Sequence, residues 1–204
     1  MKLLLASASP RRCELLRAID LDFGVRPIDL DEVAAAGDRL PADAAVTVAV
    51  AKARAADGAA AVVLAADTIV VLDDRTLGKP VDDEDARRML AALRGRTHVV
   101  VTGVAVRTED SEWTAAVESE VRMRAYSDAE IAAYVATGGG RDKAGSYGIQ
   151  DEPFVPVEAI HGCYCNVMGL PLWTAYRLLR EAGCVAPRRP GEVLSRCAVC
   201  PMNG

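Results

Sequence analysis

One aspartate follows a long apolar run and is the first residue that points to chemistry. Asp67 comes directly after Ala59–Ala66, eight residues without a polar side chain. Such a run predicts a strand covered on both faces, and open α/β sheets place ligands at the carboxyl ends of their strands. A carboxylate buried there is costly unless it meets a cation. We therefore take Asp67 as a candidate catalytic residue; the alternative is an aspartate that caps a turn.

A second acidic group lies upstream, at Asp29, Asp31 and Glu32. If Glu32 faces Asp67, the two carboxylates could hold one Mg²⁺ with several waters, the usual arrangement for this cation on a phosphate substrate. A solvent-exposed acidic turn is the alternative.

Basic residues gather where an anion could bind. Ser9 and Pro10 predict the start of a helix, and Arg11 and Arg12 follow at once. The helix macrodipole disfavours cations at that end, so two guanidinium groups there indicate a bound anion.

Lysine is rare in this chain, with four lysines against twenty arginines. Lys52 falls on a predicted helix, Lys79 between a glycine and a proline, and Lys143 in a glycine-rich stretch that matches neither a Walker A loop nor a dinucleotide fingerprint. A lysine kept against such a bias is a candidate for a role that needs a compact ammonium group.

The elements that must position these residues alternate between strands and helices. The predicted strands are Lys2–Ala6, an extended segment at the start of Asp22–Glu32, the run that ends at Asp67, a hairpin over 69–80, two long antiparallel strands joined near Glu109–Ser111, and Phe154–Ile160. The predicted helices are Pro10–Ile19, Ala42–Ala56, Asp82–Leu93, a helix through Val135 capped by Ser127 and Glu130, and Leu170–Ala182. We expect an α/β fold with a mixed central sheet flanked by helices, in two lobes with a cleft between them. Residues 1–185 form the domain, and 186–204 a flexible C-terminal extension.

Composition excludes several classes of protein. The chain has 51% hydrophobic and 26% charged residues and a net charge of −5, which argues against binding a nucleic-acid polymer. The longest apolar run is far shorter than the roughly 20 residues of a membrane span. Leu3–Ala6 is also too short for the apolar core of a signal peptide. We expect a cytoplasmic protein without a membrane partner.

The chain also has six cysteines and two histidines, residue types that can bind metal ions or take part in catalysis. Cys197 and Cys200 form a Cys-x-x-Cys pair, but Cys163 and Cys165 have a spacing unusual for structural zinc, so we expect reduced thiols. Neither His98 nor His161 lies in a sequence pattern that pairs a histidine with a catalytic partner, so we expect structural roles for both.

Several segments together resemble the Maf family of nucleoside triphosphate pyrophosphatases. They are "LLLASASPRRCELL", "IDLDE", "AADTIVVLDDRTLGKPVDDEDARRML", "LRGRTHVVVTGVAV" and "DKAGSYGIQ…IHGCYCNVMGLPL", which occur in this order over about residues 2–182. The resemblance implies hydrolysis between the α and β phosphates of a nucleoside triphosphate, a divalent cation such as Mg²⁺ or Mn²⁺, and a homodimer.

The resemblance also implies roles for single residues. Asp67, Glu32, Lys52 and Lys79 match the catalytic set, with Glu32 and Asp67 holding the metal. The substrate-binding positions are Ser7, Arg11, Arg12, Thr68, Lys143 and Gln150. Arginine, threonine and glutamine at 11, 68 and 150 resemble the branch that acts on dTTP and UTP.

Two other functions stay open on the sequence. A non-catalytic nucleotide-binding regulator of septum formation would bind the nucleotide without turnover. A phosphatase acting on the γ-phosphate would release orthophosphate instead of pyrophosphate.

Overall fold

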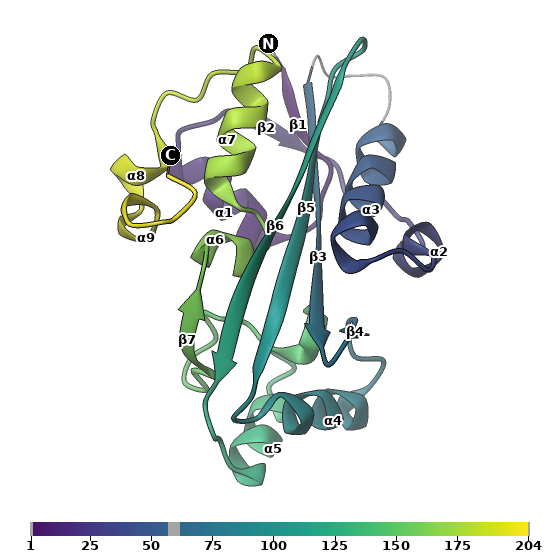
Figure 1. Ribbon diagram of the computed structural model, residues 1–204, viewed down its shortest axis with the longest axis vertical. Helices are drawn as coiled ribbons and strands as arrows, with labels where there is room; N and C mark the ends of the chain where they lie inside the picture. Colours follow the sequence, from purple (N-terminus) through teal and green to yellow (C-terminus); the bar gives the residue numbers. More distant parts are fainter. Residues whose placement is uncertain (1, 57–61, 204) are drawn as a thin grey trace. The chain divides into compact units, whose positions relative to one another are not determined.

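Strands and helices alternate along most of the chain in the computed structural model, which describes residues 2–56 and 62–203 (Figure 1). The strands are β1 Leu3–Leu5, β2 Phe23–Val25, β3 Val62–Leu72, β4 Arg75–Leu77, β5 Thr97–Arg107, β6 Glu112–Met123 and β7 Val157–His161. The helices are α1 Pro10–Ala18, α2 Glu32–Ala36, α3 Pro41–Ala55, α4 Asp83–Leu93, α5 Asp128–Ala136, the 3₁₀ turn η1 Ala144–Ser146, α6 Tyr164–Val167, α7 Leu172–Glu181, α8 Pro190–Val193 and α9 Ser195–Ala198.

The predicted mixed sheet is confirmed. Its strand order is β2-β1-β3-β5-β6-β7, and β4 pairs with β3 off this path. Strand β1 is parallel to β2 and to β3, whereas β4 is antiparallel to β3 and β7 is antiparallel to β6. Across the described ranges, no helix combines the length and the apolar character that a membrane span needs.

The chain divides into two compact units. The first comprises Met1–Thr68, Val101–Glu118 and Cys163–Gly204, and the second comprises Ile69–Val100 and Ser119–Gly162. Strands β3, β5 and β6 contribute residues to both.

In the first unit, α3 packs very closely on the sheet. Small side chains make this contact, which consists of Leu4, Ala6, Ala49, Ala53, Ala56, Val63, Ala65 and Ala105. A Cβ atom added at Gly103 of β5 would lie 2.3 Å from the carbonyl carbon of Ala45, so the α3 backbone needs glycine at that point. Figure 1 shows α3 along one side of these strands and α7 along the other.

In the second unit, α4 and α5 pack together. Tyr126 Oη donates to the Leu90 carbonyl oxygen at 2.7 Å, and its ring lies 4.9 Å from that of Phe154, which stacks on Tyr134. The predicted capping box at the start of α5 is confirmed, since Ser127 Oγ accepts from Glu130 N and Glu130 Oε2 accepts from Ser127 N.

Strand β3 differs from the prediction. Asp67 was expected at the end of a strand, but β3 continues through it to Leu72 because Ile69–Leu72 are apolar enough to extend the same strand. The turn follows at Asp73 and Asp74, both with positive φ, and β4 then pairs back on β3.

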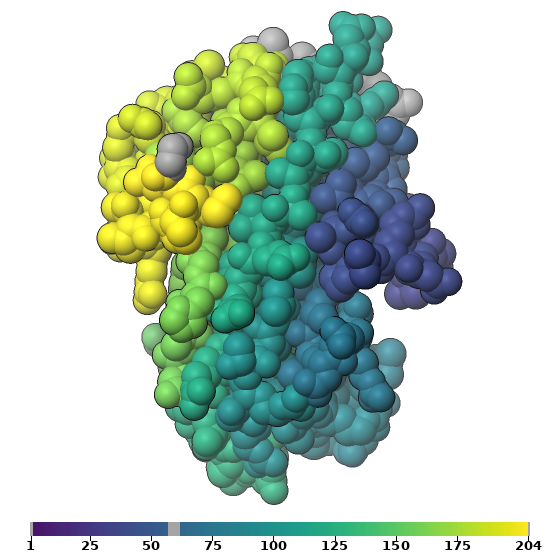
Figure 2. Space-filling view, viewed as in Figure 1, coloured from purple at the N-terminus to yellow at the C-terminus, as the bar shows by residue number. Residues whose placement is uncertain are grey.

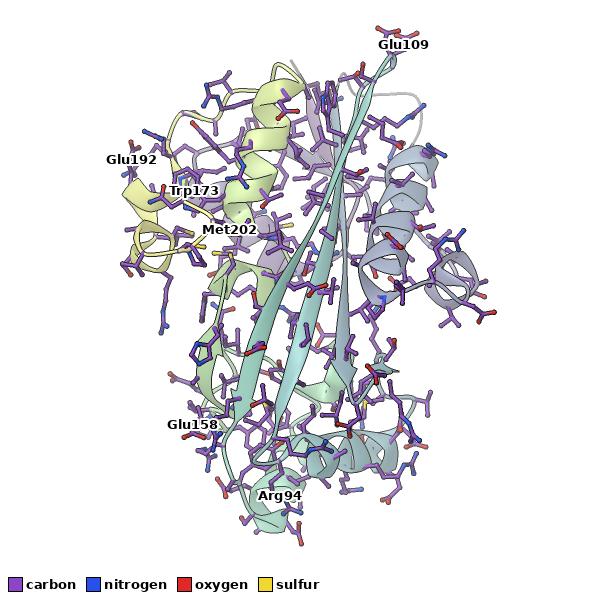
Figure 3. All side chains as sticks on the ribbon, in the orientation of Figure 1. Arg94, Glu109, Glu158, Trp173, Glu192 and Met202 are labelled. Carbon is purple, nitrogen blue, oxygen red and sulfur yellow. The ribbon has the colours of Figure 1, made fainter. Side chains whose placement is uncertain are left out.

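Residues 186–203, which we expected to form a flexible extension, contain α8 and α9 and contact the rest of the first unit. Trp173 Nε1 donates to the Cys197 carbonyl oxygen and Arg177 Nη1 to that of Met202, both at 2.9 Å. The Arg196 guanidinium lies 4.7 Å from the centre of the Tyr164 ring. Figure 2 shows this segment, in yellow, packed against the chain around it, and Figure 3 labels Trp173 near Met202.

Candidate active site

Lys52 joins two of the predicted acidic residues. Its Nζ lies 2.7 Å from Glu32 Oε1 and 2.7 Å from Asp67 Oδ1. The Lys52 and Asp67 side chains are 8% and 10% exposed, whereas that of Glu32 is 39% exposed. The geometry therefore brings together Glu32, Lys52 and Asp67, which stand far apart in the sequence.

The local structure explains how these three side chains meet. Asp31 caps α2, with Oδ1 accepting from Ala34 N, and so fixes Glu32 as the first helical residue. Lys52 lies in the last turn of α3. Side chains alternate along a strand, so Asp67 lies on the same face of β3 as Val63 and Ala65, which pack in the α3 contact.

Arg12 organises a second group. Its Nε donates to the Gly169 carbonyl oxygen at 2.7 Å, Nη1 to Ser7 Oγ at 3.1 Å and Nη2 to Thr68 Oγ1 at 3.2 Å. Thr68 Oγ1 in turn lies 3.0 Å from Thr102 Oγ1. Two other predicted residues, Ser7 and Thr68, are thus both hydrogen-bonded to Arg12.

The two groups are electrically coupled. Burial lowers the pKa of Arg12, while the nearby Asp67 and Glu32 carboxylates oppose that shift. A guanidinium nevertheless stays charged at neutral pH. Two cations, Arg12 and Lys52, therefore face two anions, Glu32 and Asp67, and this set of four charges is balanced.

Four other predicted residues make none of the contacts described above. Arg11 is half-buried on α1, beside Arg12. Lys79 and Gln150 are exposed and belong to the second unit, as does Lys143.

Lys143 is held by its own segment of the chain. Its Nζ contacts the Gly139 carbonyl oxygen, Asp142 Oδ1 at 2.9 Å and Asp151 Oδ2 at 3.4 Å. Gly145 N donates to the Gly78 carbonyl oxygen at 3.0 Å, which ties the loop before Lys79 to the turn after Lys143.

Sequence reasoning missed two members of the Arg12 group. Thr102 looks like any polar residue of a strand, and Gly169 contributes a backbone oxygen, which every residue type has. The sequence signal at position 169 is the residue type itself, because the backbone there has a φ of +105°, which favours glycine. A Cβ atom at this position would lie 3.4 Å from Thr68 Oγ1 and 3.6 Å from Arg12 Nε.

Glu32 and Asp67 could hold a magnesium ion only if a bound substrate and water supplied its other oxygen ligands. In the part of the chain that the structure describes, no three histidine, cysteine, aspartate or glutamate side chains form a ready metal site. Mg²⁺ is commonly held by one or two carboxylates, with substrate phosphates and water completing its shell. Glu32 and Asp67 are a donor set of this kind.

These features define an α/β protein with a partly buried cluster of opposite charges around Lys52. The chain belongs to the Maf family, since the family model described as Maf-like protein matches residues 2–182. A dTTP/UTP pyrophosphatase of Thermomicrobium roseum is 44% identical over 99% of this chain and 94% of its own length. One from Anaeromyxobacter dehalogenans is 50% identical over 91% of this chain and 96% of its own length.

Among solved structures, a HAM1 protein from Coxiella burnetii aligns with a TM-score of 0.44 and 20% identity, over 62% of this chain and 74% of that one. The family assignment rests on the sequence matches and not on this likeness.

Proposed function

We infer that this chain is a nucleoside triphosphate pyrophosphatase that hydrolyses dTTP and UTP to the monophosphate and pyrophosphate. Relatives 44–50% identical over at least nine-tenths of the chain carry the name dTTP/UTP pyrophosphatase. The structural observation that carries the inference is Lys52 between Glu32 and Asp67, next to Arg12. A protein that only senses nucleotide has no need of a carboxylate able to activate water.

We assign the following chemistry to the site. Water attacks the α-phosphorus, the bond from that phosphorus to the bridging oxygen breaks, and pyrophosphate leaves. Asp67 orients the water and accepts its proton, and Lys52 holds the Asp67 and Glu32 carboxylates in place. Arg12 fixes Ser7 and Thr68 and adds positive charge where the phosphates lie.

We also assign a magnesium ion, held by Glu32 and Asp67, to the working enzyme. A divalent cation supplies positive charge that stabilises the developing charge on the leaving pyrophosphate. The balance of charges supports this assignment: Glu32 and Asp67 already balance Arg12 and Lys52, so the roughly four negative charges of a triphosphate need further compensation.

The remaining roles follow from the family resemblance. We propose that Arg11, Thr68 and Gln150 contact the nucleotide and set base preference, and that Lys79 and Lys143 provide further positive charge. We further propose that the protein works in the cytoplasm as a homodimer, on free nucleotides and without a nucleic-acid or membrane partner.

The test is pyrophosphate release from a panel of nucleotides in the presence of Mg²⁺. For Asp67→Asn we expect kcat to fall by about 10² or more with dTTP and UTP, because the amide cannot accept the proton of water. Glu112→Gln is the matched control: Glu112 pairs with Arg54 on the exposed side of α3, and its loss should leave turnover unchanged.

The products decide between the candidate functions. Equal turnover by wild type and Asp67→Asn would remove Asp67 from catalysis. Nucleotide binding without any turnover would favour the regulator, and release of orthophosphate alone would favour a γ-phosphatase.

A further inference from the structure

Four of the six cysteines form one buried cluster in the first unit, and the proposed reaction uses none of them. Cys165 Sγ lies 3.4 Å from Cys197 Sγ. Cys163 shares side-chain hydrogen bonds with Cys165 and with Cys200. All four are thiols and between 1% and 7% exposed.

The cluster joins two parts of the chain. Cys163 and Cys165 lie at the start of α6, inside the segment that matches the Maf family, which ends at residue 182. Cys197 and Cys200 lie beyond it, in and just after α9. Helices α8 and α9 have four residues each, too few to form a core of their own. A segment this small commonly needs a cross-link or a metal ion to hold its structure.

We propose that Cys163, Cys165, Cys197 and Cys200 bind one zinc ion that fastens the C-terminal segment to α6. Zinc takes four thiolates in a tetrahedron, and a Cys-x-x-Cys pair is a frequent half of such a site. The sequence offers only one pair of this spacing; the fold supplies the second half by placing Cys163 and Cys165 against it. On binding, each thiol releases its proton to water and its sulfur bonds to the ion, with no change of oxidation state.

One sulfur–sulfur distance can be compared with the value that zinc requires. A Zn–S bond of about 2.3 Å places the sulfurs of a tetrahedral site about 3.8 Å apart. The Cys165–Cys197 pair is a few tenths of an ångström closer than this. In the part of the chain that the structure describes, these thiols are not arranged as a ready metal site. Binding one ion would therefore require the four sulfurs to converge, which rotation about the Cα–Cβ bonds allows.

The experiment measures metal content by elemental analysis of the full chain, expressed with zinc and purified under reducing conditions without chelator. We expect about one zinc per chain, and its loss in Cys197→Ser/Cys200→Ser. Cys13→Ser and Cys184→Ser alter buried cysteines outside the cluster and should keep the metal. The wild-type chain should also take up Co²⁺ with the charge-transfer absorption of thiolate coordination, a readout that needs no variant to fold.

Three outcomes would overturn the proposal. Wild type that binds neither zinc nor cobalt under reducing conditions would show that the thiols only pack together. Retention of zinc by the double variant would place the ion elsewhere. A Cys165–Cys197 disulfide in non-reducing mass spectrometry, with no metal bound, would make the cluster a redox site instead. None of these results depends on pyrophosphatase activity, so this proposal and the proposed function can fail separately.

Discussion

The ammonium group of Lys52 lies 2.7 Å from one oxygen of Glu32 and 2.7 Å from one of Asp67. A buried carboxylate without a cation is strongly unfavourable, so Asp67 depends on this contact. Arginine is a poor substitute, because its flat, larger head cannot occupy the same point between two oxygens. The contact therefore explains why position 52 has a lysine in a chain where arginine is much more common.

We predict that Lys52→Met lowers kcat/KM for dTTP by about 10² or more, since it removes the ammonium group that holds the Asp67 and Glu32 carboxylates in place. Arg54→Met is the matched control: Arg54 lies two residues further along α3, and its side chain is 64% exposed. Pyrophosphate release is the measurement, with circular dichroism to confirm folding. Similar losses in both variants would mean that α3 is merely destabilised.

The sequence could predict the charged residues of the site but not the contacts among them. Asp67, Glu32 and Lys52 stand out by charge, by rarity and by their match to the Maf segments. Thr102 and Gly169 do not, because a threonine in a strand and a backbone oxygen become informative only when the fold brings Arg12 to them.

At the scale of elements, periodicity and capping located the five longest helices to within a residue or two, but the short helices α2, α6, α8 and α9 were not predicted. Helix α4 was expected over Asp82–Leu93 and spans Asp83–Leu93. The end of a strand is harder to predict, as β3 shows, because a single aspartate can lie in the middle of a strand when a lysine from another element neutralises it. Residues 186–203 contact α6 and α7 through isolated hydrogen bonds and one ring contact, which no periodicity reveals.

The capping box of α5 gives a prediction at this scale. Ser127→Ala should lower the free energy of unfolding by about 1 kcal/mol, because the mutation leaves the Glu130 backbone N–H without its acceptor. Urea denaturation measures the change. Ser195→Ala serves as control, since Ser195 is the first residue of α9 and not a capping residue; an equal loss there would contradict the assignment.

At the scale of the whole molecule, stability should depend on pH through one buried histidine. His98 is 2% exposed, and its Nε2 lies 2.7 Å from Tyr147 Oη. Burial lowers the pKa of His98 from 6.5 to about 4. The unfolded chain therefore binds a proton between these two values that the folded chain does not, and stability falls as pH decreases from 6.5 to 4.

We predict that this one group removes up to about 3 kcal/mol of stability over that interval, at 1.36 kcal/mol per pH unit. Chemical denaturation at a series of pH values measures it, and His98→Gln should show a shallower slope than wild type. An unchanged slope in the variant would assign the acid sensitivity to other groups.

The close contact between Gly103 of β5 and the backbone of α3 has a consequence for the site. Because the backbone of α3 rests directly on β5 there, the helix has no clearance in which to shift. Lys52 follows Ala45 by seven residues, or about 10 Å along the axis. A methyl group at position 103 would push this part of α3 away from β5. Because a helix moves largely as one body, the displacement would also change the contact between Lys52 and Asp67. Mutations that inactivate this protein can therefore arise on a β-strand, at a residue with no side chain and no charge.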